Sequence, residues 1–304
     1  MLAPPGLRRM AAIGVALIYA ICFVAIKAGL SSLPPLLFAG LRAEIAGIAL
    51  LMVAAMLRRP ARPERRQWPG LVALALTSTT VAFAAMFLSP GRTGAGIASV
   101  LGNLQPLFVV VLAATVLGEK LTRAKGCALA LGLVGATLIV IPTISAADTG
   151  GLAGPLFALG ASASLAVGNI LLKRIGMLRN VLVITAWQLV LGGLPLLVVS
   201  ALVERGAPIS WSPAFTAILL GLAIGGTALP YLVWNALAQQ EEIGRLTLFL
   251  FLVPVFGVLL AALIFGEQVT LPEIVGLIAV AVGTLVAARD PAAPRSAQAS
   301  QASS

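Results

Sequence analysis

Two stretches decide how this chain folds: PLFVVVLAATVLGEKLT at residues 106–122 and PVFGVLLAALIFGEQVT at residues 254–270. They lie 148 positions apart, and without a gap they align a proline, a phenylalanine and a Gly-Glu-x-x-Thr turn. The same shift aligns three further pairs: Gly96 with Gly244, Ser99 with Thr247, and Gly135 with Gly283. Proline, glutamate and glycine are sparser here than leucine and alanine. Their agreement in one register therefore indicates an internal repeat rather than coincidence.

A weaker repeat signal lies in the first part of each half of the chain. A shift of 146 positions aligns three pairs: Gly14 with Gly160, Lys27 with Lys173, and Gly47 with Gly193. The two registers differ by only two residues, so they are compatible with a single duplicated unit of about half the chain.

The composition excludes a water-soluble fold. Of the 304 residues, 60% are apolar and 10% charged, against about 45–50% and about 25% in soluble domains. So few charges cannot cover the exterior of a globular protein of this length. A net charge of +10 would suit nucleic acid only if the basic residues were grouped on a polar domain, and they instead fall in short gaps between apolar runs.

Windows of about 20 apolar residues, enough to cross a hydrocarbon layer of about 30 Å, predict ten membrane spans. Continuous apolar runs indicate helices rather than barrel strands, so the expected fold class is an all-α polytopic membrane protein. The predicted spans cover residues 10–30, 35–57, 68–88, 94–117, 124–143, 151–172, 181–203, 212–238, 243–265 and 271–288.

The repeat unit is therefore five helices, used twice. Because five is odd, the second copy enters the membrane upside down, which puts Glu119 and Glu267 on opposite sides. Inverted repeats of this kind are typical of secondary transporters, which open a central cavity to either side by alternating access. We expect a first repeat over residues 10–148 and a second over 149–288, with a cytoplasmic N-terminus at 1–9 and a disordered cytoplasmic tail at 289–304.

Basic residues set the orientation. With both termini in the cytoplasm, 16 of the 20 Lys and Arg lie inside, and only Arg92 and Arg205 lie outside. Basic residues near helix ends resist translocation, so this asymmetry predicts cytoplasmic termini.

The repeat, its central proline and its Gly-Glu-x-x-Thr turn resemble those of the drug/metabolite transporter superfamily, and most closely its ten-helix EamA-type exporters. The resemblance covers about residues 10 to 288. It implies an exporter of amino acids or related small metabolites in a bacterial inner membrane, with aromatic amino acids as the preferred substrate class. It also implies that helices one to four of each repeat surround the cavity, while the fifth packs outside.

Three ionisable residues within spans are candidates for the transport path: Lys27, Arg42 and Glu44. A charged side chain in the centre of a membrane costs free energy, so such residues usually mark a functional site. Arg42 suits a substrate carboxylate, because a guanidinium binds one through two hydrogen bonds. An interhelical ion pair, or snorkelling by Lys27 and Arg42, is the structural alternative. At spacing two, Arg42 and Glu44 point to opposite sides of their helix.

Polar and kinking residues supply the other candidates. In the fourth span Asn103 either contacts the substrate or forms a hydrogen bond to a neighbouring helix. Pro106 and its mate Pro254 are paired bends where gates could move, or packing kinks that never move. Amides and aromatic rings further along the chain suit an apolar or aromatic solute with a polar end. These are Asn169, Trp187, Gln188, Tyr231, Trp234 and Asn235, with location at the membrane interface as the alternative for Trp234.

Small residues spaced by four mark the fifth and tenth spans. The stripes are Ala128, Gly132 and Ala136, then Ala279, Gly283 and Ala287. Such stripes let helices approach closely, either within the monomer or across a homodimer.

Several functions are disfavoured by what the chain lacks. It has no His and no paired intramembrane acids, so an intramembrane lipid-modifying enzyme is only an alternative, and we expect no enzyme activity, metal or cofactor. No nucleotide-binding loop is present. Exchange of phosphorylated or nucleotide-linked solutes, or passive flow through a channel, remains a rival transport mode. The expected partners are a small-molecule substrate and the lipid bilayer, with no nucleic acid, for a monomer or homodimer.

Overall fold

The computed structural model describes residues 4–60, 62–88, 104–144, 153–175, 180–265 and 269–289. Within these ranges the regular secondary structure is entirely helical. Eight of the helical segments are long and apolar enough to cross a membrane, and Gln105–Val116 is a shorter apolar helix. The prediction of an all-α polytopic membrane fold is confirmed.

Where the chain is described, the helices follow the predicted spans, and residues 94–103 of the fourth predicted span lie outside the described residues. In the first half they are α1 (Pro5–Gly29), α2 (Pro35–Met56), η1 (Arg65–Gln67), α3 (Trp68–Ala75), η2 (Leu76–Val81), α4 (Ala82–Leu88), α6 (Gln105–Val116) and α7 (Arg123–Ile144). In the second half they are α8 (Ala153–Ile175), α9 (Val181–Val203), α10 (Pro213–Ala223), η3 (Ile224–Ala228), α11 (Leu229–Ala238), α12 (Ile243–Thr247), η4 (Leu248–Phe251), α13 (Leu252–Phe265) and α14 (Leu271–Arg289).

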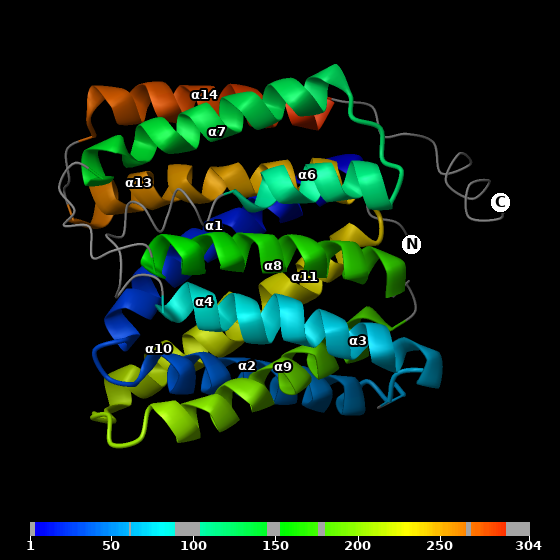
Figure 1. Cartoon of the computed structure of the whole chain (residues 1–304), viewed down its shortest axis with the longest axis vertical. Coiled ribbons are helices and arrows are strands. Elements are labelled where there is room, and N and C mark those ends of the chain that lie inside the picture. The colour runs from blue at the N-terminus through cyan, green and yellow to red at the C-terminus, as the bar shows by residue number, and fades with distance from the viewer. Residues whose placement is uncertain are drawn as a thin grey trace.

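The two halves run in opposite senses. In Figure 1 the helices cross the view, and α1 starts at the same end at which α14 finishes, which we call the terminal end. The turn between α6 and α7 also lies there, whereas α13 finishes and α14 starts at the opposite end. The repeated turn thus connects equivalent helices at opposite ends, as an odd number of helices per repeat requires.

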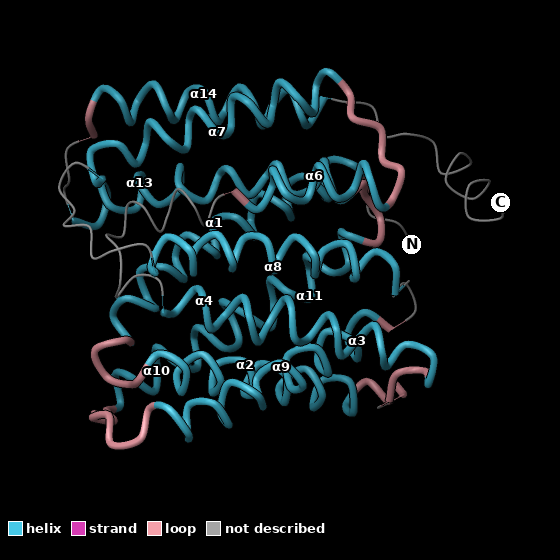
Figure 2. The backbone as a smooth tube through the Cα atoms, viewed as in Figure 1, coloured by secondary structure: helices cyan, strands magenta, loops and turns pink. Residues whose placement is uncertain are grey.

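Two helix pairs lie at the two ends of the longest axis of the molecule, at the top and bottom of Figure 2. At the bottom α2 packs on α9, and at the top α7 packs on α14. Glycine permits the close approach, since a Cβ on Gly135 would lie 2.6 Å from the carbonyl oxygen of Gly276. A Cβ on Gly283 would likewise lie 3.0 Å from the carbonyl oxygen of Ala128. The small-residue stripes therefore serve packing within the monomer.

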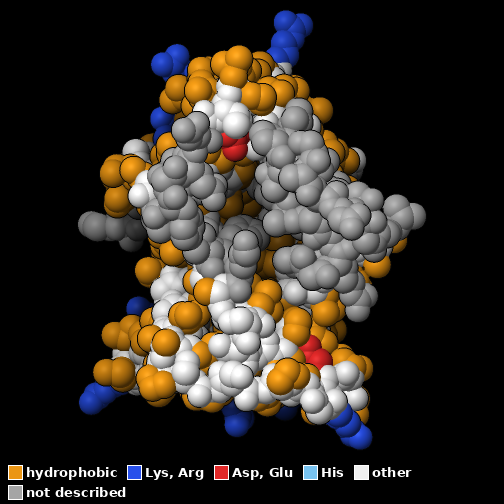
Figure 3. Space-filling view, turned by 90° about the vertical axis from the view of Figure 1, so that its left-hand side faces the viewer, with side chains coloured by type: hydrophobic (Ala, Val, Ile, Leu, Met, Phe, Trp, Pro, Cys, Tyr) orange, Lys and Arg blue, Asp and Glu red, His pale blue; other side chains and the backbone are white. Residues whose placement is uncertain are grey.

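The outer surface suits lipid and the opposite end is hollowed. Large apolar side chains such as Met56, Val198 and Leu285 are more than half exposed along the helices, which would be costly in water but not in a bilayer. In the space-filling view of the opposite end, a central hollow has hydrophobic side chains visible inside it (Figure 3).

Candidate functional site

Arg42 is the centre of the candidate site. It projects from α2 and is only 3% exposed. Its Nε donates a hydrogen bond to Thr227 Oγ1 at 2.5 Å, and its NH2 donates to the carbonyl oxygen of Gly226 at 3.1 Å. Its NH1 is buried without a hydrogen-bond partner among the described residues. None of the ion pairs between described residues involves Arg42. The site therefore holds a positive charge with unused donor capacity.

Aromatic rings flank the guanidinium. The Cζ atom of Arg42 lies 5.3 Å from the centre of the Phe83 ring, which favours the cation. Tyr231 packs edge-on against Phe83 at 6.0 Å, and its hydroxyl donates to the carbonyl oxygen of Ser78 at 3.1 Å. Cys22 of α1 completes this side, with Sγ 3.5 Å from the carbonyl oxygen of Gly226. Aromatic and apolar side chains thus lie beside the guanidinium of Arg42.

Two π-helical segments build the backbone of the site. η2 and η3 interrupt the third helix of each half, and the 148-residue shift superimposes their starts, Leu76 on Ile224. π-Helical turns expose backbone groups that an α-helix would satisfy and are frequent at functional sites. In η3 the Gly226 carbonyl accepts from Arg42 and Cys22, and the residue four positions later, Pro230, has no N–H that could compete for it.

The repeat also relates the side chains of this site. The 148-residue shift pairs Thr79 with Thr227 and Phe83 with Tyr231. Phe83 and Tyr231 contact each other directly, so an aromatic pair lies where the two halves meet. Arg42 of the first half bonds to η3 of the second, and Tyr231 of the second half bonds to η2 of the first. Substrate sites of inverted-repeat transporters lie at such an interface.

A second polar cluster lies on α8, α9 and α11. The Asn235 side chain donates to Thr185 Oγ1 at 2.9 Å and to Gln188 Oε1 at 3.0 Å. Trp234 Nε1 donates to Asn169 Oδ1 at 2.8 Å. Trp234 is 6% exposed, so its ring lies within the protein and not on the outer surface. Asn235 thus uses both N–H groups of its amide on protein acceptors, and Asn169 also donates to the carbonyl oxygen of Leu165 at 3.1 Å.

The remaining predicted residues are dispersed. Glu44 faces α9, where a Cβ on Gly193 would lie 2.7 Å from its Oε1, and that oxygen has no partner in the described part of the chain. Arg42 and Glu44 thus face different neighbours, as their spacing predicted. Trp187 packs edge-on against Trp68 at 5.4 Å. Asn103 and the side chain of Lys27 lie outside the described residues.

The two predicted bend residues both lie in the first turn of an α-helical segment. Pro106 lies in the first turn of α6, whose described part begins at Gln105. Pro254 lies in the first turn of α13, directly after the 3-10 segment η4. Their role as paired bends where gates move stays a prediction.

Sequence reasoning missed part of the site. Ser78, Thr79, Phe83 and Gly226 were not singled out. An extension of the 148-residue register backward from the repeated turn would have paired Thr79 with Thr227 and Phe83 with Tyr231. That pairing was the available signal.

Comparison with known proteins agrees with this architecture. The sequence model of the EamA-like transporter family matches residues 9–141 and again residues 152–289. The chain belongs to the EamA-like transporter family. This family assignment rests on nearly the whole chain, with one match in each half.

Individual relatives extend the EamA-like assignment. The chain is 31% identical to the uncharacterized transporter YvbV of Bacillus subtilis, over 83% of this chain and 82% of that protein. It is 31% identical to a probable amino-acid metabolite efflux pump of Salmonella typhimurium, over 90% of this chain and 91% of the relative. A crystal structure with 17% identity has the same fold, with a TM-score of 0.78 over 92% of this chain and 96% of that one.

Proposed function

We propose that this EamA-like transporter is a secondary exporter of amino acids, or related small carboxylates, that binds the substrate carboxylate at Arg42. The single observation that carries the proposal is the buried guanidinium whose NH1 has no partner among the described residues. The relative described as a probable amino-acid metabolite efflux pump supports the same substrate class.

The charge of Arg42 needs an anion. A buried charge without a counter-ion is destabilising by several kcal/mol, and here carbonyl, hydroxyl and ring contacts offset only part of that cost. A carboxylate bound through two parallel N–H···O bonds would use the free NH1 and neutralise the site. An amino acid supplies that group in every case, whatever its side chain.

The surroundings of Arg42 favour an aromatic or apolar side chain on the substrate. Phe83 and Tyr231 offer ring faces and edges next to the cation, and aromatic pairs add to apolar burial. Asn235 lies on α11 together with Tyr231, and Gln188 lies on α9. The amides of Asn235 and Gln188 would orient polar atoms of the solute. A phosphorylated solute would call for several cations, and this cluster supplies one.

The charge distribution supports one orientation in the membrane. The terminal end carries the exposed arginines of the α2–α3 connection, including Arg58, Arg59 and Arg66, and basic connections stay in the cytoplasm. We therefore infer a bacterial inner membrane protein with cytoplasmic termini. The inverted halves would open the Arg42 site to each side in turn.

The test is efflux from proteoliposomes loaded with labelled amino acids, with aromatic ones in the panel. Arg42→Gln should reduce efflux at subsaturating substrate by about tenfold or more, because a charge-assisted hydrogen bond contributes about 1.5–3 kcal/mol. Arg205→Gln, which removes an exposed cation at the opposite end, is the control and should leave efflux unchanged. Equal efflux by the parent and Arg42→Gln would exclude the proposed role.

A further inference from the structure

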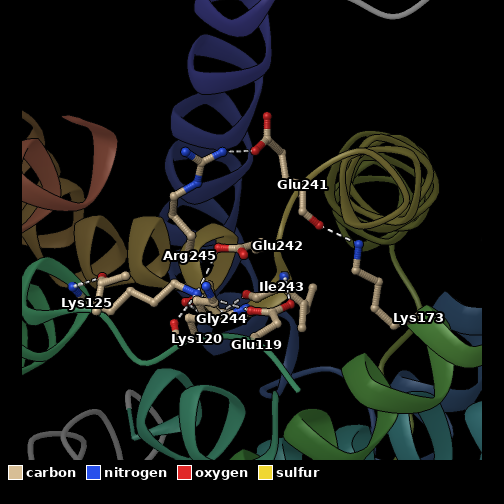
Figure 4. Close-up of polar contacts among 11 residues, drawn as sticks. Glu119, Lys120, Lys125, Lys173, Glu241, Glu242, Ile243, Gly244 and Arg245 are labelled. Carbon is tan, nitrogen blue, oxygen red and sulfur yellow. Dashed lines mark hydrogen bonds and ion pairs between the residues drawn. The ribbon is translucent and has the colours of Figure 1, made fainter. Parts of the chain in front are cut away.

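A buried ionic cluster lies around Glu119 at the terminal end (Figure 4). Glu119 follows α6 in the repeated Gly-Glu turn and is 7% exposed. Its Oε1 accepts a hydrogen bond from the backbone N–H of Ile243 at 2.8 Å, and its Oε2 accepts from Gly244 at 3.0 Å. These are the first residues of α12, so one carboxylate from the first half caps a membrane helix of the second.

Lys125 of α7 locks this cap in place. It is 2% exposed, and its Nζ lies 3.4 Å from Glu119 Oε2 and 2.8 Å from Glu242 Oε2. It also donates to the carbonyl oxygen of Lys120 at 3.1 Å. A single ammonium thus joins the turn after α6, the start of α7 and the residue before α12.

Further pairs tie neighbouring helices to the same loop. Glu241 pairs with Arg8 of α1 at 3.0 Å and with Arg245 of α12, while Lys173 of α8 donates to its carbonyl oxygen. In Figure 4 these groups converge on the connection that leads into α12. Side chains of α1, α7, α8 and α12 therefore all bind Glu241 or Glu242, the two residues that precede α12.

The opposite end lacks this fastening in its described part. All four ion pairs between described residues lie at the terminal end. The residue 148 positions after Lys125 is Glu273, and among the described residues its carboxylate caps its own helix, since it accepts from the backbone N–H and the hydroxyl of Thr270 at 2.6 and 2.7 Å. The sequence therefore repeats the turn but replaces the central cation with an anion, and the hollow of Figure 3 lies at this end.

We propose that Glu119, Lys125 and Glu242 are positioning residues of the transport cycle, which close the terminal end by holding the start of α12 against α6 and α7. This proposal rests on the alternating-access function proposed above. Release of the cluster opens the path between α6 and α12. Removal of one partner leaves a buried charge uncompensated and shifts the population toward the state open at the terminal end.

A buried cysteine, introduced at position 113, reports the opening. Ala113 of α6 is 1% exposed and lies behind the cluster, because a Cβ on Gly244 would be 3.7 Å from its Cβ. Ala113→Cys, in a background with Cys22→Ala and Cys127→Ala, would be labelled by a membrane-impermeant maleimide only when α12 moves away. Inverted vesicles present the terminal end to the reagent, and intact spheroplasts present the other.

The matched control is Glu204→Gln. Glu204 also caps a helix through two backbone N–H bonds, to Leu36 at 2.9 Å and Leu37 at 3.0 Å, but at the opposite end. Glu119→Gln should raise the labelling rate of the introduced cysteine about tenfold in inverted vesicles, since loss of a hydrogen bond to a charged group is a change of that order. Glu204→Gln should leave it at the parental rate.

Two results would overturn the proposal: an unchanged rate in Glu119→Gln, or an equal rise in Glu204→Gln, which would mean general loosening. If Glu119→Gln does not fold, Glu242→Gln keeps the cap on α12 while it removes one ion pair, and it should raise the rate in the same direction. Labelling requires no substrate. A failure here is therefore distinct from a failure of Arg42 to bind a carboxylate.

Discussion

Arg42 shows how a single residue is held ready by its neighbours. Its guanidinium donates hydrogen bonds to the Thr227 hydroxyl and the Gly226 carbonyl of η3 and lies near the Phe83 ring. Its NH1 has no hydrogen-bond partner among the described residues. The sequence predicted Arg42 as a carboxylate ligand from its position within a span. The sequence also carries a signal for the free Gly226 carbonyl that was not used, because the residue four positions later is Pro230, which has no N–H to donate.

The hydroxyl of Thr227 should matter for binding. Thr227→Val removes the acceptor of Arg42 Nε, so the guanidinium loses its orientation and substrate affinity should fall about fivefold to tenfold. Thr115→Val is the control, because the Thr115 hydroxyl bonds only to carbonyls of its own helix and should bind normally. An unchanged dissociation constant in Thr227→Val, measured by isothermal titration, would refute this role.

The contact between Cys22 and Gly226 should be sterically tight. A Cβ on Gly226 would lie 2.5 Å from Cys22 Sγ, so Gly226→Ala should lower the midpoint of thermal unfolding in detergent. In the double variant Cys22→Ala/Gly226→Ala the obstructing sulfur is gone, and most of the loss should be recovered. Additive losses in the two variants would show that the sulfur is not the obstacle.

At the scale of elements, the spans could be predicted closely and their internal breaks could not. Val181–Val203 and Ile243–Phe265 begin and end as expected, because long apolar runs bounded by charges or turns define a membrane helix. Hydropathy does not reveal the internal breaks. The span Ile243–Phe265 is divided into α12, η4 and α13, and two other spans contain the π segments η2 and η3, yet all three spans are apolar. These breaks depend on contacts between the halves, such as the Glu119 cap, that no local pattern contains.

The packing of α7 on α14 gives a test of the elements. Gly135→Ala should destabilise the protein, because the new Cβ would lie 2.6 Å from the Gly276 carbonyl oxygen and must push the helices apart. Gly126→Ala, in the same helix with nothing within 4 Å of the new Cβ, is the control. It should be neutral or stabilising by about 0.5–1 kcal/mol. Thermal unfolding of the two variants in parallel measures the difference, and a stabilised Gly135→Ala would contradict the packing.

At the scale of the whole molecule, two inverted halves bring Arg42, η2 and η3 together at their interface. This architecture was predictable, since the repeat is visible at one register and the number of helices per repeat is odd. The orientation in the membrane gives a prediction of its own, because Leu121 and Leu271 are exposed at opposite ends.

Single cysteines at those two positions, in a background without Cys22 and Cys127, should therefore label from opposite sides. Leu121→Cys should react with an impermeant maleimide in inverted vesicles, and Leu271→Cys in spheroplasts. Reaction of both from one side would contradict the topology, and reversal of the pattern would contradict only the orientation.

The carboxylate at Arg42 is the central claim, and it is tested most directly by comparison of an amino acid with its decarboxylated amine. Binding of tryptophan and of tryptamine to the purified protein isolates that one group, because the indole ring is the same in both. The account predicts that tryptophan binds at least about tenfold more tightly and that Arg42→Gln abolishes the difference. Equal binding of the two by the parent protein would contradict it.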